Sequence, residues 1–541
     1  MKKSTPIWLT IAIAVAAFVT GLLIDFHHVN AVPKATEEAR NPKIKAIIDL
    51  ILDEYVDSLN PDQLIERSIP LMLKGLDPHT SYFDSHNSKI PRERTDGVIP
   101  DIGIVFIIFN DTVHVECIVP AGPSDIAGIL PGDCIVKIDG QPTANINKAS
   151  GEIFKLLSGP NGSTVTLSVL RHGYPKILDF TVTRNRIIKR TLDSYYLLDK
   201  NTGYIKVNQF ERNTYNEFVQ ALTQLQAQGA KRFMIDLRGN GGGYMETAVL
   251  MANEFLPAKQ TIVTTRGRRK QYNQPFNSDG KGKFQNVELA VLVDEYSASA
   301  SEIFAGALQD NDRALIVGRR SFGKGLVQND FMLPDSSILR LAVARYYTPS
   351  GRCIQKNYNY HETRFYEDEL LERFKHGEFF NKDSIRIDKS LAFTTRHGRT
   401  VYGGGGIIPD VFVARDTAGI NKYFIDVDNA GLLQRFAFAY CEKNRKTLKQ
   451  MSDYKQFLRT TPIDNDLIKE FANFAAANGI VPRWYYINHS HDLILTKIKS
   501  IIAHDIFGPE AYSAIVNRND KTVQEALKAL NRHKAAFPIT D

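Results

Sequence analysis

Serine, lysine and amide side chains stand close together in two runs of this sequence. Residues 293–302 read VDEYSASASE, and residues 321–328 read SFGKGLVQ. A serine hydroxyl becomes a nucleophile when a nearby base takes its proton, and a neutral lysine amine can be that base. Because neither run contains a histidine, these residue types indicate serine–lysine chemistry rather than a histidine-assisted triad.

The residues around the serines predict a strand that turns directly into a helix. Residues 288–293 form an apolar run typical of a buried strand, and residues 301–310 carry apolar residues at helical spacing. At such a turn a backbone N–H of the helix N-terminus can stabilise a developing oxyanion. Ser297, Ser299 and Ser301 all meet this description, and the residues alone do not choose among them.

A lysine that acts as a general base needs a depressed pKa. Its ordinary pKa is about 10.4, so work near neutral pH requires a decrease of roughly 2 to 3 units, which burial in apolar surroundings supplies. An apolar wall can form here from Phe322, Leu326 and Val327. Gln328 can orient the Lys324 amine by accepting a hydrogen bond, without the negative charge that would raise the lysine pKa.

The same stretch nearly matches a phosphate-binding loop. Residues 318–325 read GRRSFGKG, against the pattern GxxxxGK[ST]. Gly325 stands where a Ser or Thr hydroxyl would hold magnesium, so nucleotide binding is disfavoured. Taken singly, the serines could be a helix cap and the lysine a solvated loop residue, but their joint occurrence argues against that interpretation.

A second strand–turn–helix pattern lies upstream. Residues 232–243 read RFMIDLRGNGGG, an apolar strand followed by a glycine-rich turn, and residues 244–256 have helical character. Alone, this pattern indicates only a tight turn. Beside a serine nucleophile, its backbone N–H groups could stabilise an oxyanion.

Together these motifs resemble those of the carboxyl-terminal processing serine peptidases, also called tail-specific proteases. That family uses the middle serine of a Ser-Ala-Ser-Ala-Ser-Glu run, the lysine of a Ser-Phe-Gly-Lys-Gly run, and a glutamine four residues later. The resemblance implies that Ser299, Lys324 and Gln328 are the catalytic residues. No metal, nucleotide or other cofactor is expected.

The resemblance also implies an oxyanion hole. The N–H of Ala300 would pair with the N–H of Gly242 or Gly243, and Gly241 stands where proline is frequent in the family. A further family turn matches at residues 76–82, which read LDPHTSY. For its histidine, His79, we expect a structural role because the Asp-Pro pair predicts a turn.

Residues 96–188 have the strand and helix order of a PDZ-like module. Such modules hold an extended peptide as an added strand, with its terminal carboxylate on backbone N–H groups. Here Ile102, Gly103 and Ile104 would form the carboxylate-binding loop, and apolar substrate C-termini are expected. On its own, this module would indicate a peptide-binding scaffold.

Composition places the chain among multidomain globular proteins. It has 541 residues, 43% of them hydrophobic and 23% charged, and its net charge of +7 does not favour nucleic-acid binding. The four cysteines lack metal-type spacing, and a disulfide between Cys117 and Cys134 is permitted but cannot be deduced. An apolar run at residues 7–24 follows Lys2 and Lys3, which predicts a signal peptide or an uncleaved inner-membrane anchor and, with the resemblance, a periplasmic location.

The predicted fold is multidomain α+β, with a PDZ-like β-rich module inserted before a ClpP/crotonase-like α/β serine peptidase domain. N-terminal helices precede it and a helical C-terminal extension follows. The expected divisions are residues 1–31 (signal peptide or anchor), 38–95 (helical region), 96–188 (PDZ-like), 189–414 (Ser-Lys peptidase) and 415–541 (helical extension). Within the peptidase domain, the charged insert at 357–395 is expected to be a surface excursion.

The function we expect is a serine endopeptidase that captures protein C-termini and cleaves with a Ser-Lys dyad supported by Gln. Its expected partners are protein or peptide substrates, the inner membrane through the N-terminal segment, and a second copy or an adaptor through the C-terminal helices. Two alternatives remain. One is a catalytically inactive or gated PDZ-containing scaffold in the periplasm, and the other, an acyl-CoA enzyme on a related fold, is disfavoured by the Ser-Lys pair.

Overall fold

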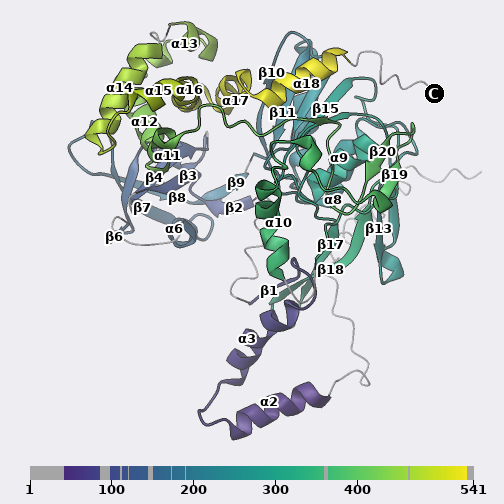
Figure 1. The fold of residues 1–541 in the computed structure, drawn as a ribbon. Coiled ribbons are helices and arrows are strands. Elements are labelled where there is room, and N and C mark those ends of the chain that lie inside the picture. The colour runs from purple at the N-terminus through teal and green to yellow at the C-terminus, as the bar shows by residue number, and fades with distance from the viewer. Residues whose placement is uncertain are drawn as a thin grey trace, which may run out of the picture.

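The computed structural model describes residues 42–85, 98–109, 112–119, 121–143, 150–171, 173–188, 190–358, 363–460 and 464–532. The predicted membrane segment at residues 7–24 lies outside these ranges. In the described part, which begins at residue 42, no helix is both long and apolar enough to cross a membrane. Figure 1 shows N-terminal helices, a β-rich module, a larger α/β unit and a group of C-terminal helices.

A six-stranded sheet forms the centre of the α/β unit. Its order is β10-β11-β12-β15-β16-β21, and all neighbouring pairs except β10–β11 are parallel. Parallel strands require crossover connections, and helices supply them here. The elements are β10 (Leu192–Leu197), β11 (Thr202–Val207), α7 (Thr214–Ala227), β12 (Arg232–Asp236), α8 (Met245–Asn253), β15 (Glu288–Val293), α9 (Ala300–Asp310), β16 (Leu315–Gly318) and β21 (Val411–Phe412).

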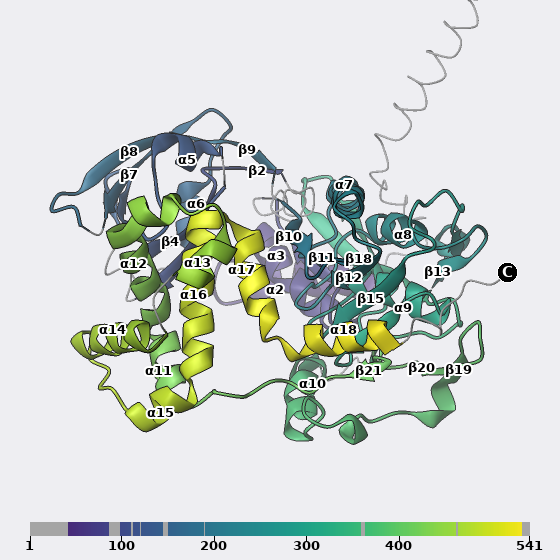
Figure 2. The ribbon, with the colours of Figure 1, turned by 90° about the horizontal axis from the view of Figure 1, so that it is seen from above.

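Both faces of this sheet are buried, because successive side chains alternate between two cores. Ile235 packs among residues of α7, α8 and α9, and its neighbour Met234 points to the opposite core. That second core is closed by α18 (Lys521–Arg532), which lies along the sheet in Figure 2. The last helix of the region expected to be a helical C-terminal extension thus covers the sheet of the α/β unit.

A second sheet includes β17, the strand that begins within the lysine-containing run at Leu326. Its order is β1-β18-β13-β14, with β17 paired to β18. The N-terminal region contributes β1, which pairs antiparallel with β18 and so holds the turn at residues 76–82 against the α/β unit. The strands are β1 (Ser81–Phe83), β13 (Thr261–Gly267), β14 (Gln274–Asn277), β17 (Leu326–Met332) and β18 (Ile338–Tyr347).

The β-rich module has a sheet of order β3-β4-β5-β7-β8, with β6 paired to β5. An antiparallel ribbon, β2–β9, connects the module to the rest of the chain. Cys117 and Cys134 are free thiols in the module. The elements are β2 (Val98–Asp101), β3 (Ile104–Phe109), β4 (Thr112–Ile118), α5 (Pro123–Ala127), β5 (Cys134–Ile138), β6 (Gln141–Pro142), α6 (Ser150–Leu157), β7 (Thr164–Leu170), β8 (Leu178–Thr183) and β9 (Asn185–Ile188).

The C-terminal helices before α18 share a core of their own and contact both other units. A Cβ on Gly132 of the β-rich module would lie 2.9 Å from Phe438 Cβ, and Ser194 Oγ of β10 donates to Ser513 Oγ at 2.8 Å. The helices are α11 (Lys422–Asn429), α12 (Leu432–Lys449), α13 (Tyr454–Thr460), α14 (Asp464–Ala477), α15 (Trp484–His489), α16 (His491–Phe507) and α17 (Pro509–Arg518).

The N-terminal helices α2 (Pro42–Glu54) and α3 (Pro61–Leu73) project away from the other units in Figure 1. Neither helix has a buried residue. Large apolar side chains of the first helix are therefore exposed, with Ile44 52% and Ile47 47% accessible.

Candidate active site

The middle serine lies on a sharp turn between β15 and α9. Ser299 has φ 57° and ψ −114°, a conformation that costs a non-glycine residue about 1 to 3 kcal/mol and that surrounding bonds must maintain. Its N–H donates to Glu302 Oε2 at 2.8 Å, and its carbonyl accepts from Tyr346 Oη at 3.1 Å. The backbone of Ser299 is thus held from both sides.

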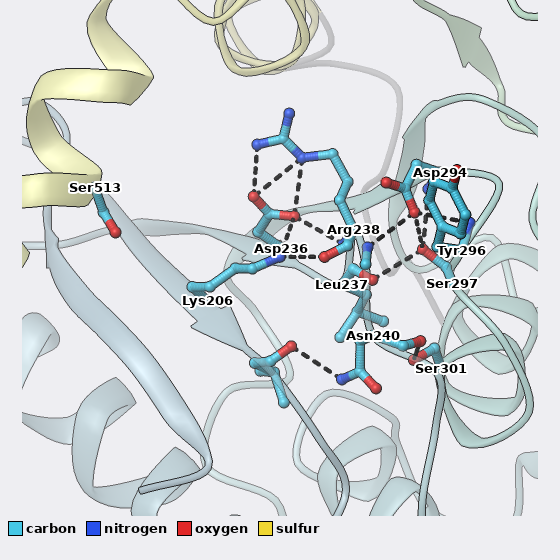
Figure 3. Close-up of polar contacts among 12 residues, drawn as sticks. Lys206, Asp236, Leu237, Arg238, Asn240, Asp294, Tyr296, Ser297, Ser301 and Ser513 are labelled. Carbon is cyan, nitrogen blue, oxygen red and sulfur yellow. Dashed lines mark hydrogen bonds and ion pairs between the residues drawn. The ribbon is translucent and has the colours of Figure 1, made fainter. Parts of the chain in front are cut away.

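The flanking serines have structural roles, as Figure 3 shows. Ser297 Oγ donates to Leu237 O at 2.9 Å, and Ser301 Oγ donates to Asn240 O at 2.9 Å. Both serines are fully buried, whereas Ser299 is partly exposed. Of the three serines that the residues left open, Ser299 alone combines exposure with the strained turn.

The glycine-rich turn packs directly against Ser299. A Cβ on Gly242 would lie 2.8 Å from Ser299 Cβ, and its φ of 106° also requires glycine. The Gly242 N–H donates to Asn240 Oδ1 at 2.8 Å, so it is already used. Among the described residues, the N–H groups of Gly243 and Ala300 have no acceptor. Of the two glycine N–H groups, only that of Gly243 is therefore unpaired within the described part of the chain.

Lys324 is held by an amide. Its Nζ donates to Gln328 Oε1 at 2.9 Å, and Gln328 Nε2 in turn donates to His79 O at 2.7 Å. Desolvation by burial lowers the Lys324 pKa, and the positive charge of Arg340 lowers it further, while Glu302 opposes the shift. These surroundings thus make the Lys324 amine easier to deprotonate than that of an exposed lysine.

His79 takes part through its backbone. Its N–H donates to Asp77 Oδ1 at 2.9 Å, its carbonyl holds Gln328, and its Nε2 lies 2.7 Å from Tyr366 Oη. Burial, followed by the positive charge of Lys324, lowers the His79 pKa to about 4. This arrangement fits the structural role expected from the sequence, because a neutral imidazole packs here and its carbonyl positions the amide.

Glu302 and Tyr346, which the sequence did not single out, join the serine turn to the lysine loop. Besides Ser299, Glu302 Oε2 accepts from the Lys324 N–H at 2.8 Å, and Oε1 accepts from the Gly323 N–H and Ser321 Oγ at 2.7 and 2.6 Å. Tyr346 Oη donates to the carbonyls of both Ser299 and Lys324. A sequence signal for Glu302 existed, since Ser299-x-x-Glu302 matches a capping box.

Burial raises the pKa of Glu302 to about 7, although its four hydrogen-bond donors oppose the shift. The carboxyl is fully buried, so its ionised form depends on those donors. The same contacts therefore favour the ionised form of Glu302 and fix the conformation of the loop around Lys324.

The insert expected as a surface excursion packs against the lysine loop instead. Its helix α10 (Thr363–Lys375) carries Tyr366, which is 5% exposed and meets the Phe322 ring edge-on at 5.9 Å. Lys356 Nζ lies 4.0 Å from the Phe322 centroid and 4.1 Å from that of Tyr366. Arg373 of α10 also donates to Ser321 O at 3.0 Å. The insert contains β19 (Ala392–Thr394), which pairs with β20 (Thr400–Tyr402).

Within the described residues, no direct hydrogen bond joins Lys324 Nζ to Ser299 Oγ. Catalytic hydrogen bonds are often long in ligand-free enzymes and tighten when substrate binds. The two residues are nevertheless tied together through the shared contacts of Glu302 and Tyr346.

The expected carboxylate-binding loop lies between β2 and β3. The carbonyls of Ile102 and Gly103 accept from the N–H groups of Ser124 and Val119, each at 2.9 Å. Gly103 has φ 79°, and Ile104 begins β3, which among the described strands has a partner on one side only. The loop is thus fixed at the end of a free strand edge.

Comparison with known proteins identifies three segments. Residues 201–361 match peptidase family S41, residues 114–171 match a PDZ domain, and residues 423–508 match a family of unknown function. The carboxy-terminal-processing protease of Bartonella bacilliformis is 36% identical over 313 residues, covering 57% of this chain and 71% of that protein.

Two further proteins are similar to the chain. The Staphylococcus aureus protein named "Probable CtpA-like serine protease" is 32% identical over 321 residues, covering 59% of this chain and 63% of that one. A solved structure, the photosystem II D1 C-terminal processing protease, aligns with 25% identity and a TM-score of 0.38, covering 69% of this chain and 86% of that one. On the extent and identity of the Bartonella match, this chain belongs to the carboxy-terminal-processing serine peptidases of family S41.

Proposed function

We propose that the chain is an endopeptidase in which Ser299 is the nucleophile and Lys324 the general base. The neutral Lys324 amine takes the Ser299 proton as Oγ attacks the scissile carbonyl, and it later returns a proton to the leaving amine. The N–H groups of Ala300 and Gly243 stabilise the tetrahedral oxyanion. Water then hydrolyses the acyl-enzyme ester.

The observation that carries this proposal is the environment of Lys324. Its amine is desolvated, its pKa is lowered, and its partner Gln328 is a neutral amide. A lysine placed for structural reasons would ordinarily pair with a carboxylate, which keeps it charged. The side chain of Glu302 accepts instead from the backbone of Lys324, which leaves the amine free to act as a base.

The PDZ domain supplies substrate capture in this proposal. Within the described part of the chain its strand β3 pairs only with β4, so an extended peptide can add to the open edge with its terminus at Ile102, Gly103 and Ile104. Capture there and cleavage at Ser299 would together favour long, unfolded chains with apolar ends.

The test is digestion of an unstructured protein with an apolar C-terminus by the full-length chain, read by mass spectrometry. Ser299→Ala and Lys324→Ala should each lower turnover by at least about a thousandfold. Lys281→Ala, which changes an exposed lysine of the same unit, is the matched control and should retain activity. Turnover that survives in Ser299→Ala would contradict the assignment of Ser299 as the nucleophile. Peptide binding without cleavage by the wild-type chain would favour the scaffold alternative.

A further inference from the structure

The carboxylate-binding loop of the PDZ domain already holds a carboxylate of its own. Asp101 Oδ1 accepts a hydrogen bond from the Ile102 N–H at 2.6 Å. Ile102 is the first of the three residues whose N–H groups are expected to bind a substrate C-terminus. The N–H expected to bind the substrate carboxylate therefore already donates to an acidic side chain of the loop.

Among the described residues, Asp101 forms no ion pair. The charge of Arg184 acts on Asp101, but the Arg184 guanidinium is bonded to α6: its Nε donates to Leu157 O at 2.7 Å, and its Nη2 donates to Leu156 O at 3.1 Å. Burial raises the Asp101 pKa, whereas the Ile102 N–H and Arg184 act in the opposite direction.

The position of Asp101 in the sheet makes the conflict direct. Asp101 ends β2, and β3 begins three residues later at Ile104 with an open edge. A peptide that adds to this edge and ends in the loop would bring its carboxylate next to that of Asp101. Like charges at such short range oppose binding, and one N–H cannot serve both carboxylates well.

We propose that Asp101 is a specificity-determining residue that acts as an internal competitor for the substrate carboxylate. It weakens capture of free C-termini, so this PDZ domain accepts apolar segments that lack a terminal carboxylate about as well as true C-termini. This inference rests on the proposed capture of peptides by the PDZ domain.

The test compares two peptides with the same apolar C-terminal sequence, one ending in a carboxylate and the other in a carboxamide. Both are titrated against the full-length chain carrying Ser299→Ala, which prevents cleavage, with and without Asp101→Asn. Asparagine keeps the acceptor for the Ile102 N–H and removes the charge. Asp139→Asn is the matched control, because Asp139 Oδ1 likewise accepts a backbone N–H, that of Thr166 at 2.8 Å, on an exposed turn of the same domain.

We expect Asp101→Asn to tighten binding of the carboxylate peptide by about tenfold or more and to leave the carboxamide peptide within about twofold. Asp139→Asn should change neither affinity. A carboxylate affinity that is measurable but unaltered by Asp101→Asn overturns the inference and leaves peptide capture intact. If neither peptide binds any of these proteins, peptide capture itself fails and the inference fails with it.

Discussion

Replacing Gln328 with glutamate tests whether Lys324 acts as a neutral base. Lys324 Nζ and Gln328 Oε1 are 2.9 Å apart, so Gln328→Glu sets a carboxylate against the amine at nearly unchanged length. At an effective dielectric constant of about 20, unit charges at that distance attract by about 6 kcal/mol, equivalent to about 4 pKa units. Dehydration of the new carboxylate offsets part of this, and we expect the Lys324 pKa to rise by about 1 to 3 units.

The expected consequence is a shift in the pH dependence of catalysis. Because only the neutral amine can take the Ser299 proton, kcat/KM rises with pH through the Lys324 pKa. Gln328→Glu should move this acid limb upward by about 1 to 3 pH units and lower kcat/KM at neutral pH by about 10- to 1000-fold. The assay is cleavage of a quenched fluorescent peptide from about pH 6 to about pH 11, a range that brackets shifted and ordinary lysine pKa values.

Gln328→Met separates the charge from the lost hydrogen bonds. Methionine removes the contacts with both Lys324 Nζ and His79 O but adds no charge. It should lower kcat without moving the limb upward, and activity of Gln328→Glu should recover toward that of Gln328→Met at high pH. A folded Gln328→Glu enzyme whose acid limb coincides with that of the wild type would refute the role of Lys324.

Two further predictions concern groups around the dyad. In Glu302→Gln the amide leaves at least one backbone N–H without its acceptor: that of Gly323 in one orientation, or those of Ser299 and Lys324 in the other. Urea unfolding should show a decrease of about 1 to 3 kcal/mol in the free energy of unfolding, and peptide assays should show a reduced kcat. An unchanged kcat would contradict the role of Glu302 in joining the serine turn to the lysine loop. The His79 pKa is lowered from 6.5 to about 4, so between these values the folded state binds fewer protons than the unfolded state. The free energy of unfolding therefore decreases as the pH is lowered through this range. The wild-type chain should lose free energy of unfolding between pH 7 and pH 5, and His79→Asn should reduce that loss by about 2 kcal/mol. Part of the loss should remain because the His114 pKa is also lowered to about 4. An equal loss in wild type and variant would show that His79 titrates normally.

The local elements around the site follow from short patterns in the sequence. The strand expected at residues 288–293 is β15, and the helix expected from residue 301 is α9, which begins one residue earlier. Apolar runs and helical spacing suffice here because burial of these residues on both sheet faces leaves little alternative. The insert at 357–395 was expected on the surface because its helix is rich in charged residues. One of these, Arg373, instead forms a buried ion pair with Glu378 at 2.9 Å.

The sequence by itself determined which reactive groups are present: a serine at a strand-to-helix turn, a lysine between glycines, and a glutamine four residues after the lysine. Only the tertiary structure decided how these groups are used, because their partners come from distant segments. Glu302 joins Ser299 to the Lys324 backbone, and His79 anchors Gln328 from 249 positions away, so the contacts of Lys324 and His79 depend on how these segments pack together. Burial and hydrogen bonding set the charge state of each group, and both are properties of the folded chain.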